Sequence, residues 1–175
     1  MLPLSNAFDA IRDFMERGGD VLYGILIVTF LMWVLIIERL WYFRATYRAE
    51  AKQVIDAWNA RADTRSWYAH KIRGAMISQI TENLQQGVGM IKTLVAVCPL
   101  IGLLGTVTGM ISVFEVMAVM GSGNARAMAA GVSKATIPTM AGMVAALSGL
   151  FMSTYIERKA KREAEKLEDS LTMEH

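Results

Sequence analysis

The chain has 175 residues, 54% of them hydrophobic, and a formal net charge of +2. This length suffices for one domain with a sizeable core, and the small net charge gives no indication of a nucleic-acid partner. Cys98 is the single cysteine, and His70 and His175 have no partner at metal-ligand spacing. An intramolecular disulfide is therefore excluded, and we expect neither a metal site nor a cofactor.

Three segments are long and apolar enough to cross a lipid bilayer. No charged residue occurs from Val21 to Ile37 or from Ala135 to Ile156, and the stretch before Lys134 is nearly as apolar. Crossing a bilayer takes about 20 apolar residues, whereas a core helix rarely needs more than about 14. The sequence therefore predicts an all-α integral membrane protein with transmembrane helices over 21–43, 93–120 and 133–156.

Residues 1–20 precede the first transmembrane helix and have an amphipathic pattern. Over 4–17 one helical face is apolar, and Gly18-Gly19 ends the pattern; the apolar positions are Leu4, Phe8, Ile11 and Met15. We expect this helix to lie on the outer membrane surface, with a poorly ordered terminus as the alternative. A cleaved signal peptide fits less well, because the leading segment is acidic and the apolar run is too long.

The distribution of Lys and Arg predicts the orientation. Residues 38–92 and the tail together hold 14 of the 18 basic residues, which favours an N-out/C-in topology. The aromatic cluster Trp41-Tyr42-Phe43 would then mark the cytoplasmic interface of the first span.

The two cytoplasmic segments are expected to be helical extensions of the spans. In the loop 44–92, apolar residues recur every four positions and indicate a helix–helix seam; they are Ile72, Met76, Ile80 and Leu84. In the tail 157–175, strong helix formers of mixed charge indicate that the third span continues as a helix.

An outer (periplasmic) hairpin over 121–132 would join the second and third spans. Its Gly, Ser and Asn residues suit a short turn. If the turn is centred on residues 123–125, Glu115 and Lys134 come level with each other. We therefore hypothesise an ion pair between them, which would offset part of the cost of two charges near the membrane, against the alternative that each reaches the interface alone.

Small and hydroxyl residues replace leucines within the second and third spans. Gly102, Gly105 and Gly109 have the spacing that lets helix backbones approach closely, so tight packing is the first interpretation of the glycines. One face of each span also carries hydroxyls, which suits a narrow, wettable path. We expect this path to be lined by Thr106, Thr139, Thr136, Gly102 and Gly109.

Such a path requires several copies of the chain, because three helices cannot enclose a pore. No carboxylate lies in the middle of a span, and hydroxyls do not ionise near neutral pH. If protons move here, the titrating group should come from another polypeptide.

The segments GLLGTVTGM (102–110) and GVSKATIPTMAGMVAAL (131–147) resemble the ExbB/TolQ/MotA proton-channel family. The likeness is sharpest over residues 92–156. The three-span layout is most similar to the compact ExbB proteins of TonB systems, whereas MotA-like members have a fourth span.

The resemblance implies a homopentamer whose second and third spans line a central pore. A single-span partner, ExbD or its equivalent, would bring a proton-binding aspartate into that pore. Thr106 and Thr139 match the family's pore-lining threonines. The complex would use proton flow across the bacterial inner membrane to drive a TonB-like protein in outer-membrane nutrient uptake.

The sequence departs from the family pattern at two places. Many relatives carry a glutamate where this chain has Lys134, and the proline that often follows the third-span motif is absent. With lysine at this position, the resemblance carries no acidic pore residue over to this chain.

Two other functions compete with this interpretation: a TolQ-like cell-envelope subunit, and a passive membrane scaffold whose threonines only pack. We expect no enzyme and no catalytic residues, because the sequence contains no nucleophile–base pair and no phosphate-binding loop.

Overall fold

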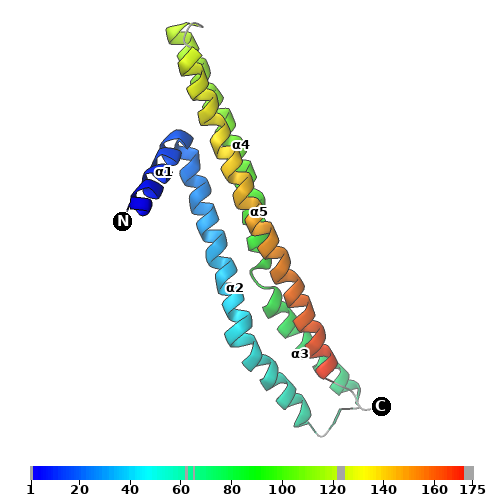
Figure 1. Ribbon diagram of the computed structural model, residues 1–175. Helices are drawn as coiled ribbons and strands as arrows, with labels where there is room; N and C mark the ends of the chain where they lie inside the picture. The colour runs from blue at the N-terminus through cyan, green and yellow to red at the C-terminus, as the bar shows by residue number, and fades with distance from the viewer. Residues whose placement is uncertain (1, 62, 65, 122–124, 172–175) are drawn as a thin grey trace. The chain divides into compact units, whose positions relative to one another are not determined.

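The computed structural model describes residues 2–61, 63–64, 66–121 and 125–171. Within these ranges the chain forms five α-helices and no strand (Figure 1). The helices are α1 (Leu2–Gly18), α2 (Asp20–Asn59), α3 (Trp67–Gln85), α4 (Val88–Met120) and α5 (Ala125–Ser170). Residues 122–124 of the expected outer hairpin and 172–175 of the expected tail lie outside the described residues.

Three of these helices are long and apolar enough to cross a membrane, which confirms the all-α membrane fold. They are the helices that contain the predicted spans, α2, α4 and α5. With 40 residues in α2 and 46 in α5, both exceed the roughly 20 residues that cross a bilayer. Each therefore continues as a helix beyond its apolar run, as the sequence predicts.

Glycines in a left-handed backbone conformation follow the ends of three helices. Gly19 (φ 68°), Gly87 (φ 77°) and Gly121 (φ 72°) come directly after α1, shortly after α3 and directly after α4. Only glycine adopts this conformation without steric cost, so these positions set where the helices stop. At its other end α3 is capped by Ser66, whose hydroxyl accepts a hydrogen bond of 3.1 Å from the Ala69 amide.

The chain divides into two compact units. Unit 1 contains Met1–Trp33 and Thr93–Leu150, and unit 2 contains Val34–Lys92 and Phe151–His175. Most of the apolar runs of α4 and α5 fall in unit 1, whereas α3 and the charged end of α5 fall in unit 2.

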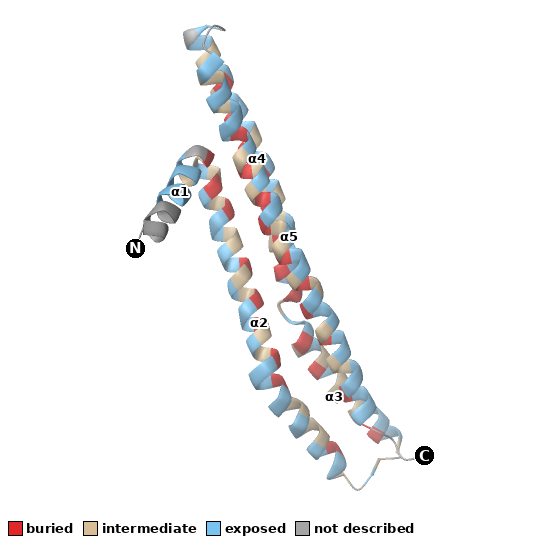
Figure 2. Ribbon diagram, in the orientation of Figure 1, coloured by how far each residue is buried: buried red, intermediate tan, exposed pale blue. Residues whose placement is uncertain are grey.

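Unit 1 packs the start of α2 against α4 and α5. Its core cluster is formed by Leu22, Ile25, Cys98 and Ala145, and Met15 of α1 packs against it. Cys98 is completely buried, as expected for a cysteine that acts as a small apolar residue. Much of the surface of these helices is exposed (Figure 2). It carries large apolar side chains such as Leu103 and Val144, which suits a surface in contact with lipid.

Unit 2 packs the second half of α2, α3 and the end of α5 around a core of larger side chains. Trp58, Ile80, Leu84 and Ile156 are at most 5% exposed. The four-residue repeat along α3 is therefore a helix–helix seam, as its spacing predicts.

Polar groups also connect the helices of unit 2. The Tyr47 hydroxyl donates to the Glu163 carbonyl at 2.9 Å and joins α2 to α5. Arg73 donates to the carbonyls of Leu171 (2.7 Å) and Glu168 (2.8 Å), which joins α3 to α5.

Candidate pore-lining hairpin

The backbones of α4 and α5 are in direct contact in unit 1. A methyl group added at Gly102 would lie 2.9 Å from the Pro138 carbonyl oxygen, and one at Gly109 would lie 2.5 Å from the Ala135 Cα atom. From the other side, a methyl group at Gly142 would lie 2.6 Å from the Cys98 carbonyl oxygen. Lipid provides no hydrophobic force between helices, so this close van der Waals contact is what holds them together.

One hydrogen bond links the two helices at the predicted pore threonines. The Thr139 hydroxyl of α5 donates to the Gly102 carbonyl of α4 at 3.0 Å. Because Gly102 lacks a side chain, α5 approaches closely enough for this contact. Thr139 is half-buried, so it lies at the edge of the interface and not at its centre.

The other two threonines bond within their own helices. Thr106 donates to the Leu103 carbonyl at 2.6 Å, and Thr136 donates to the Val132 carbonyl at 2.7 Å. Thr106 is half-buried and Thr136 is exposed. Their hydroxyl oxygens keep acceptor capacity for water or for a partner, because a hydroxyl both donates and accepts.

The five residues predicted to line a pore thus fall into two groups, buried glycines and threonines that reach the surface. Gly102 and Gly109 are buried between α4 and α5, because even a methyl group would overlap the facing backbone, and they serve packing in this chain. Thr106, Thr136 and Thr139 reach the surface of the hairpin. The hydroxyls are therefore the groups that this chain can present to a path between copies.

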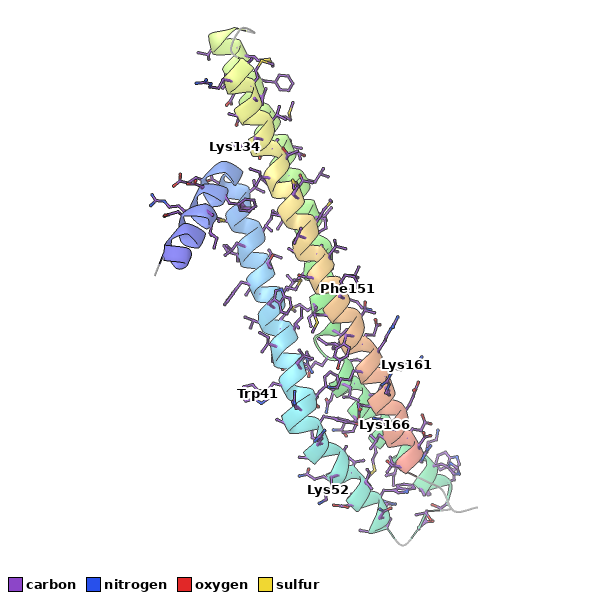
Figure 3. The ribbon with its side chains drawn as sticks, viewed as in Figure 1. Trp41, Lys52, Lys134, Phe151, Lys161 and Lys166 are labelled. Atoms are coloured by element: carbon purple, nitrogen blue, oxygen red, sulfur yellow. The ribbon has the colours of Figure 1, made fainter. Side chains whose placement is uncertain are left out.

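The structure does not bring Glu115 and Lys134 together. Both side chains are exposed, and the ion pairs formed within the described ranges include none between them. The Lys134 side chain instead passes over the turn between α1 and α2, where a methyl group on Gly19 would lie 2.8 Å from its Cε atom (Figure 3). The Lys134 side chain is therefore directed to this turn.

Pro138 and Ala135 complete the hairpin interface, although the sequence placed Ala135 only on the helical face of Thr139 and gave Pro138 no role. Pro138 is completely buried, and a methyl group on Gly105 would lie 2.5 Å from its Cβ atom. Ala135 is 5% exposed and faces Gly109. The sequence pattern that could have predicted this interface is a repeat of small or compact residues every three to four positions, formed by Ala135, Pro138, Gly142 and Ala145.

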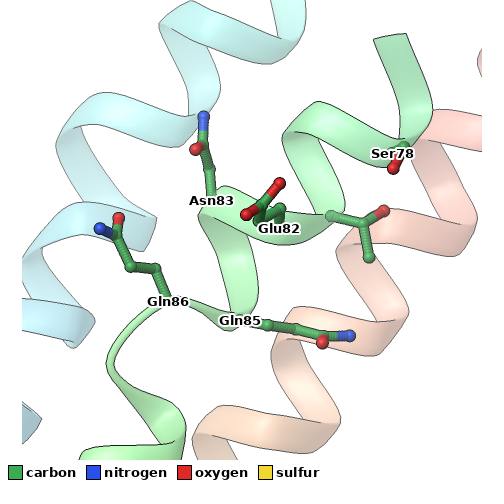
Figure 4. Close-up of a pocket in the computed structure, with 6 residues that line it drawn as sticks. Ser78, Glu82, Asn83, Gln85 and Gln86 are labelled. Carbon is green, nitrogen blue, oxygen red and sulfur yellow. The ribbon is translucent and has the colours of Figure 1, made fainter. Parts of the chain in front are cut away.

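A polar concavity of about 580 Å³ lies along the end of α3 in unit 2 (Figure 4). Its lining is hydroxyl, amide and one carboxylate: Ser78, Thr81, Glu82, Asn83, Gln85 and Gln86. These groups can hold water through hydrogen bonds. Over the described ranges, no three His, Cys, Asp or Glu residues gather where they could hold a metal ion.

The fold and the hairpin define a class of protein, a multi-pass α-helical membrane protein whose second and third spans pack through small residues and present hydroxyls. The model of the MotA/TolQ/ExbB proton channel family matches residues 43–169. The chain belongs to this family.

Two relatives point to the ExbB branch of the family. An ExbB homologue of Methanothermobacter thermautotrophicus, named as a biopolymer transport protein, is 23% identical over 197 aligned positions, which cover 95% of this chain and 70% of the relative. An ExbB-like biopolymer transport protein of Synechocystis is 39% identical over 72 residues, which cover 39% of this chain and 28% of that protein.

Proposed function

We propose that this chain is the channel and stator subunit of an ExbB–ExbD–TonB-type motor in a bacterial inner membrane. It acts as a homopentamer with the N-terminus outside. A single-span, ExbD-like partner lies in the central pore and contributes the aspartate that takes up and releases protons. The motor couples inward proton flow to a TonB-like protein and thereby to outer-membrane nutrient uptake.

The observation that carries this proposal is the position of the threonine hydroxyls. Gly102 and Gly109 bring α4 and α5 into backbone contact, and this leaves Thr106, Thr136 and Thr139 at the edges of the interface. Copies arranged in a ring would then face one another with these hydroxyls. Such a surface holds water and leaves room for a partner helix.

The proton-binding group has to come from the partner. Between Thr93 and Ile156 the only carboxylate is Glu115, near the outer end of α4. A hydroxyl-lined path conducts water-borne protons but does not store one. Each proton that crosses 100 mV releases about 2.3 kcal/mol, so mechanical work takes several protons per cycle.

The first test is the native mass of the detergent-extracted chain, alone and co-expressed with its single-span partner. A homopentamer that takes up the partner supports the shared pore. A stable monomer or dimer that ignores the partner contradicts the proposal and favours the scaffold. Uptake of a partner belonging to a cell-envelope constriction system would assign the chain to a TolQ-like role.

The second test measures proton flux in vesicles that contain the complex. Thr106→Val keeps the shape of the side chain but removes its hydroxyl. It should lower the flux about tenfold, because the loss of one hydrogen bond of about 1.4 kcal/mol along the path slows a rate by that factor. Thr108→Val is the matched control, because Thr108 lies on another face of α4 and donates to the Gly105 carbonyl of its own helix. Equal flux in the wild type and both variants would favour the passive scaffold.

A further inference from the structure

A pocket of about 380 Å³ lies in unit 2 between the first turn of α4 and the charged part of α5. Its apolar floor includes Val88 and Ala160, which are 7% and 2% exposed. Its polar lining includes Lys92, Glu157 and Lys161. The pocket therefore combines an apolar floor with charged groups at its mouth.

The lining of the pocket has more positive than negative charges. The Lys92 ammonium lies 2.7 Å from a Glu157 carboxylate oxygen. Among the described side chains, Lys161 has no ion-pair partner. The lining thus carries two ammonium groups and one carboxylate, which favours an anionic ligand.

The sequence places this pocket at the end of the apolar spans. Lys92 directly precedes the apolar run of α4, and Glu157 directly follows that of α5. The neighbouring Lys159 ammonium lies 5.2 Å from the centre of the Phe43 ring, which belongs to the predicted interfacial aromatic cluster. With the predicted spans placed in a bilayer, the ammonium groups of the pocket come at the depth of the lipid headgroups.

We propose that this pocket binds the phosphate group of an anionic phospholipid from the cytoplasmic leaflet, of the phosphatidylglycerol type. Lys161 and Lys92 contact the phosphate, and the acyl chains extend into the bilayer. Glu157 competes with the phosphate for Lys92 and so weakens binding. This assignment rests on the N-out/C-in orientation of the proposed function.

The test measures the lipid retained by the intact chain. The protein is reconstituted in vesicles of equal parts phosphatidylglycerol and phosphatidylcholine and extracted in mild detergent, and bound lipids are counted by native mass spectrometry. The wild type should retain phosphatidylglycerol in preference to phosphatidylcholine. Lys161→Gln and Lys92→Gln should each reduce this preference about fivefold, the usual effect of one basic residue near an anionic membrane surface.

Two further variants separate binding from folding. Lys52→Gln removes the same charge from exposed α2 surface outside the pocket and should leave retention unchanged. Glu157→Gln should increase retention, although it breaks the ion pair. If Glu157→Gln instead lowers retention as the lysine variants do, the ion pair is only structural and the lipid site is overturned.

Other outcomes also decide the proposal. Equal retention of both lipids by the wild type overturns it. Displacement of the lipid by inorganic phosphate at equal concentration shows that the acyl chains contribute nothing, which overturns the lipid as the ligand. Because retention is measured without the single-span partner, a chain that retains the lipid but conducts no protons contradicts the proposed function alone.

Discussion

Unit 1 and unit 2 are held together by different interactions, although three helices contribute to both. In unit 1, α4 and α5 meet through glycine, alanine and proline, and the described contacts between them include one side-chain hydrogen bond, from Thr139. In unit 2, large buried side chains are supplemented by Tyr47, Arg73 and Arg39, which donate to carbonyls of neighbouring helices.

The difference follows from the solvent that each unit meets. In lipid, burying a leucine gains little, so close contact between small residues provides the attraction. In water, burial of Trp58 or Leu84 is itself favourable, and interhelix hydrogen bonds then select one arrangement. Substitutions should therefore act through shape in unit 1 and through polar contacts in unit 2.

Gly142→Ala should have the largest effect. Its methyl group would lie 2.6 Å from the Cys98 carbonyl oxygen, so α4 and α5 must separate, and the free energy of unfolding should fall by about 2–3 kcal/mol. Denaturation by SDS in mixed micelles measures this change. The control Gly74→Ala adds its methyl group where no atom lies within 4 Å. It should stabilise α3 by about 0.5–1 kcal/mol.

Arg39→Met should have the next largest effect, in unit 2. Arg39 is 8% exposed, and its guanidinium donates to the Asn83 carbonyl in the last turn of α3 at 3.2 Å. Loss of this charged donor should cost about 2 kcal/mol, measured by the same denaturation. Arg48→Met on the exposed surface of α2 is the control, and an equal loss in both variants would contradict the role of the buried guanidinium.

Tyr47→Phe should cost about 1 kcal/mol and change the pH dependence of stability. Burial, and secondly the negative charge of Glu163, raise the pKa of Tyr47 from 10.0 to about 12. The folded chain thus holds this proton more tightly than the unfolded chain. The stabilisation is complete below pH 10 and is lost as the pH rises towards 12.

Denaturation curves of the wild type and Tyr47→Phe between these pH values isolate the contribution of this phenol. The difference in stability between the two proteins should narrow as the pH rises. A constant difference would show that Tyr47 ionises alike in both states.

Thr139→Val should have the smallest effect on stability. It removes the hydrogen bond to Gly102 but keeps the shape of the side chain, and such bonds in membranes contribute about 0.6 kcal/mol on average. If the Thr139 hydroxyl also lines the pore, proton flux should fall markedly while the free energy of unfolding stays nearly unchanged. If Thr139→Val lowered the free energy of unfolding by more than Arg39→Met does, hydrogen bonding would be a main stabilising interaction in unit 1, and the comparison of the two units would be wrong.

The number of spans and the family of this protein can be predicted from its sequence. The charge-free runs predict the spans, because crossing a bilayer requires about 20 apolar residues. The helix–helix seam and the family are predicted by two other local patterns, the repeat that includes Ile80 and Leu84 and the Gly-Thr-Val segment. Helical periodicity also predicts that Gly102, Thr106 and Gly109 lie on one face of α4.

The partner that each of these residues contacts depends on how the helices pack and does not follow from the sequence pattern. Periodicity gives the face of a helix but not the element that covers it. Gly102 and Gly109 lie against α5, and Thr139 bonds to a carbonyl 37 residues away. Lys134 lies by Gly19, and no ion pair joins it to Glu115 within the described ranges. Such contacts depend on how closely two helices approach and on how each is rotated about its own axis. Both quantities are set by the packing of the facing backbones and small side chains, which the pattern of one helix does not reveal.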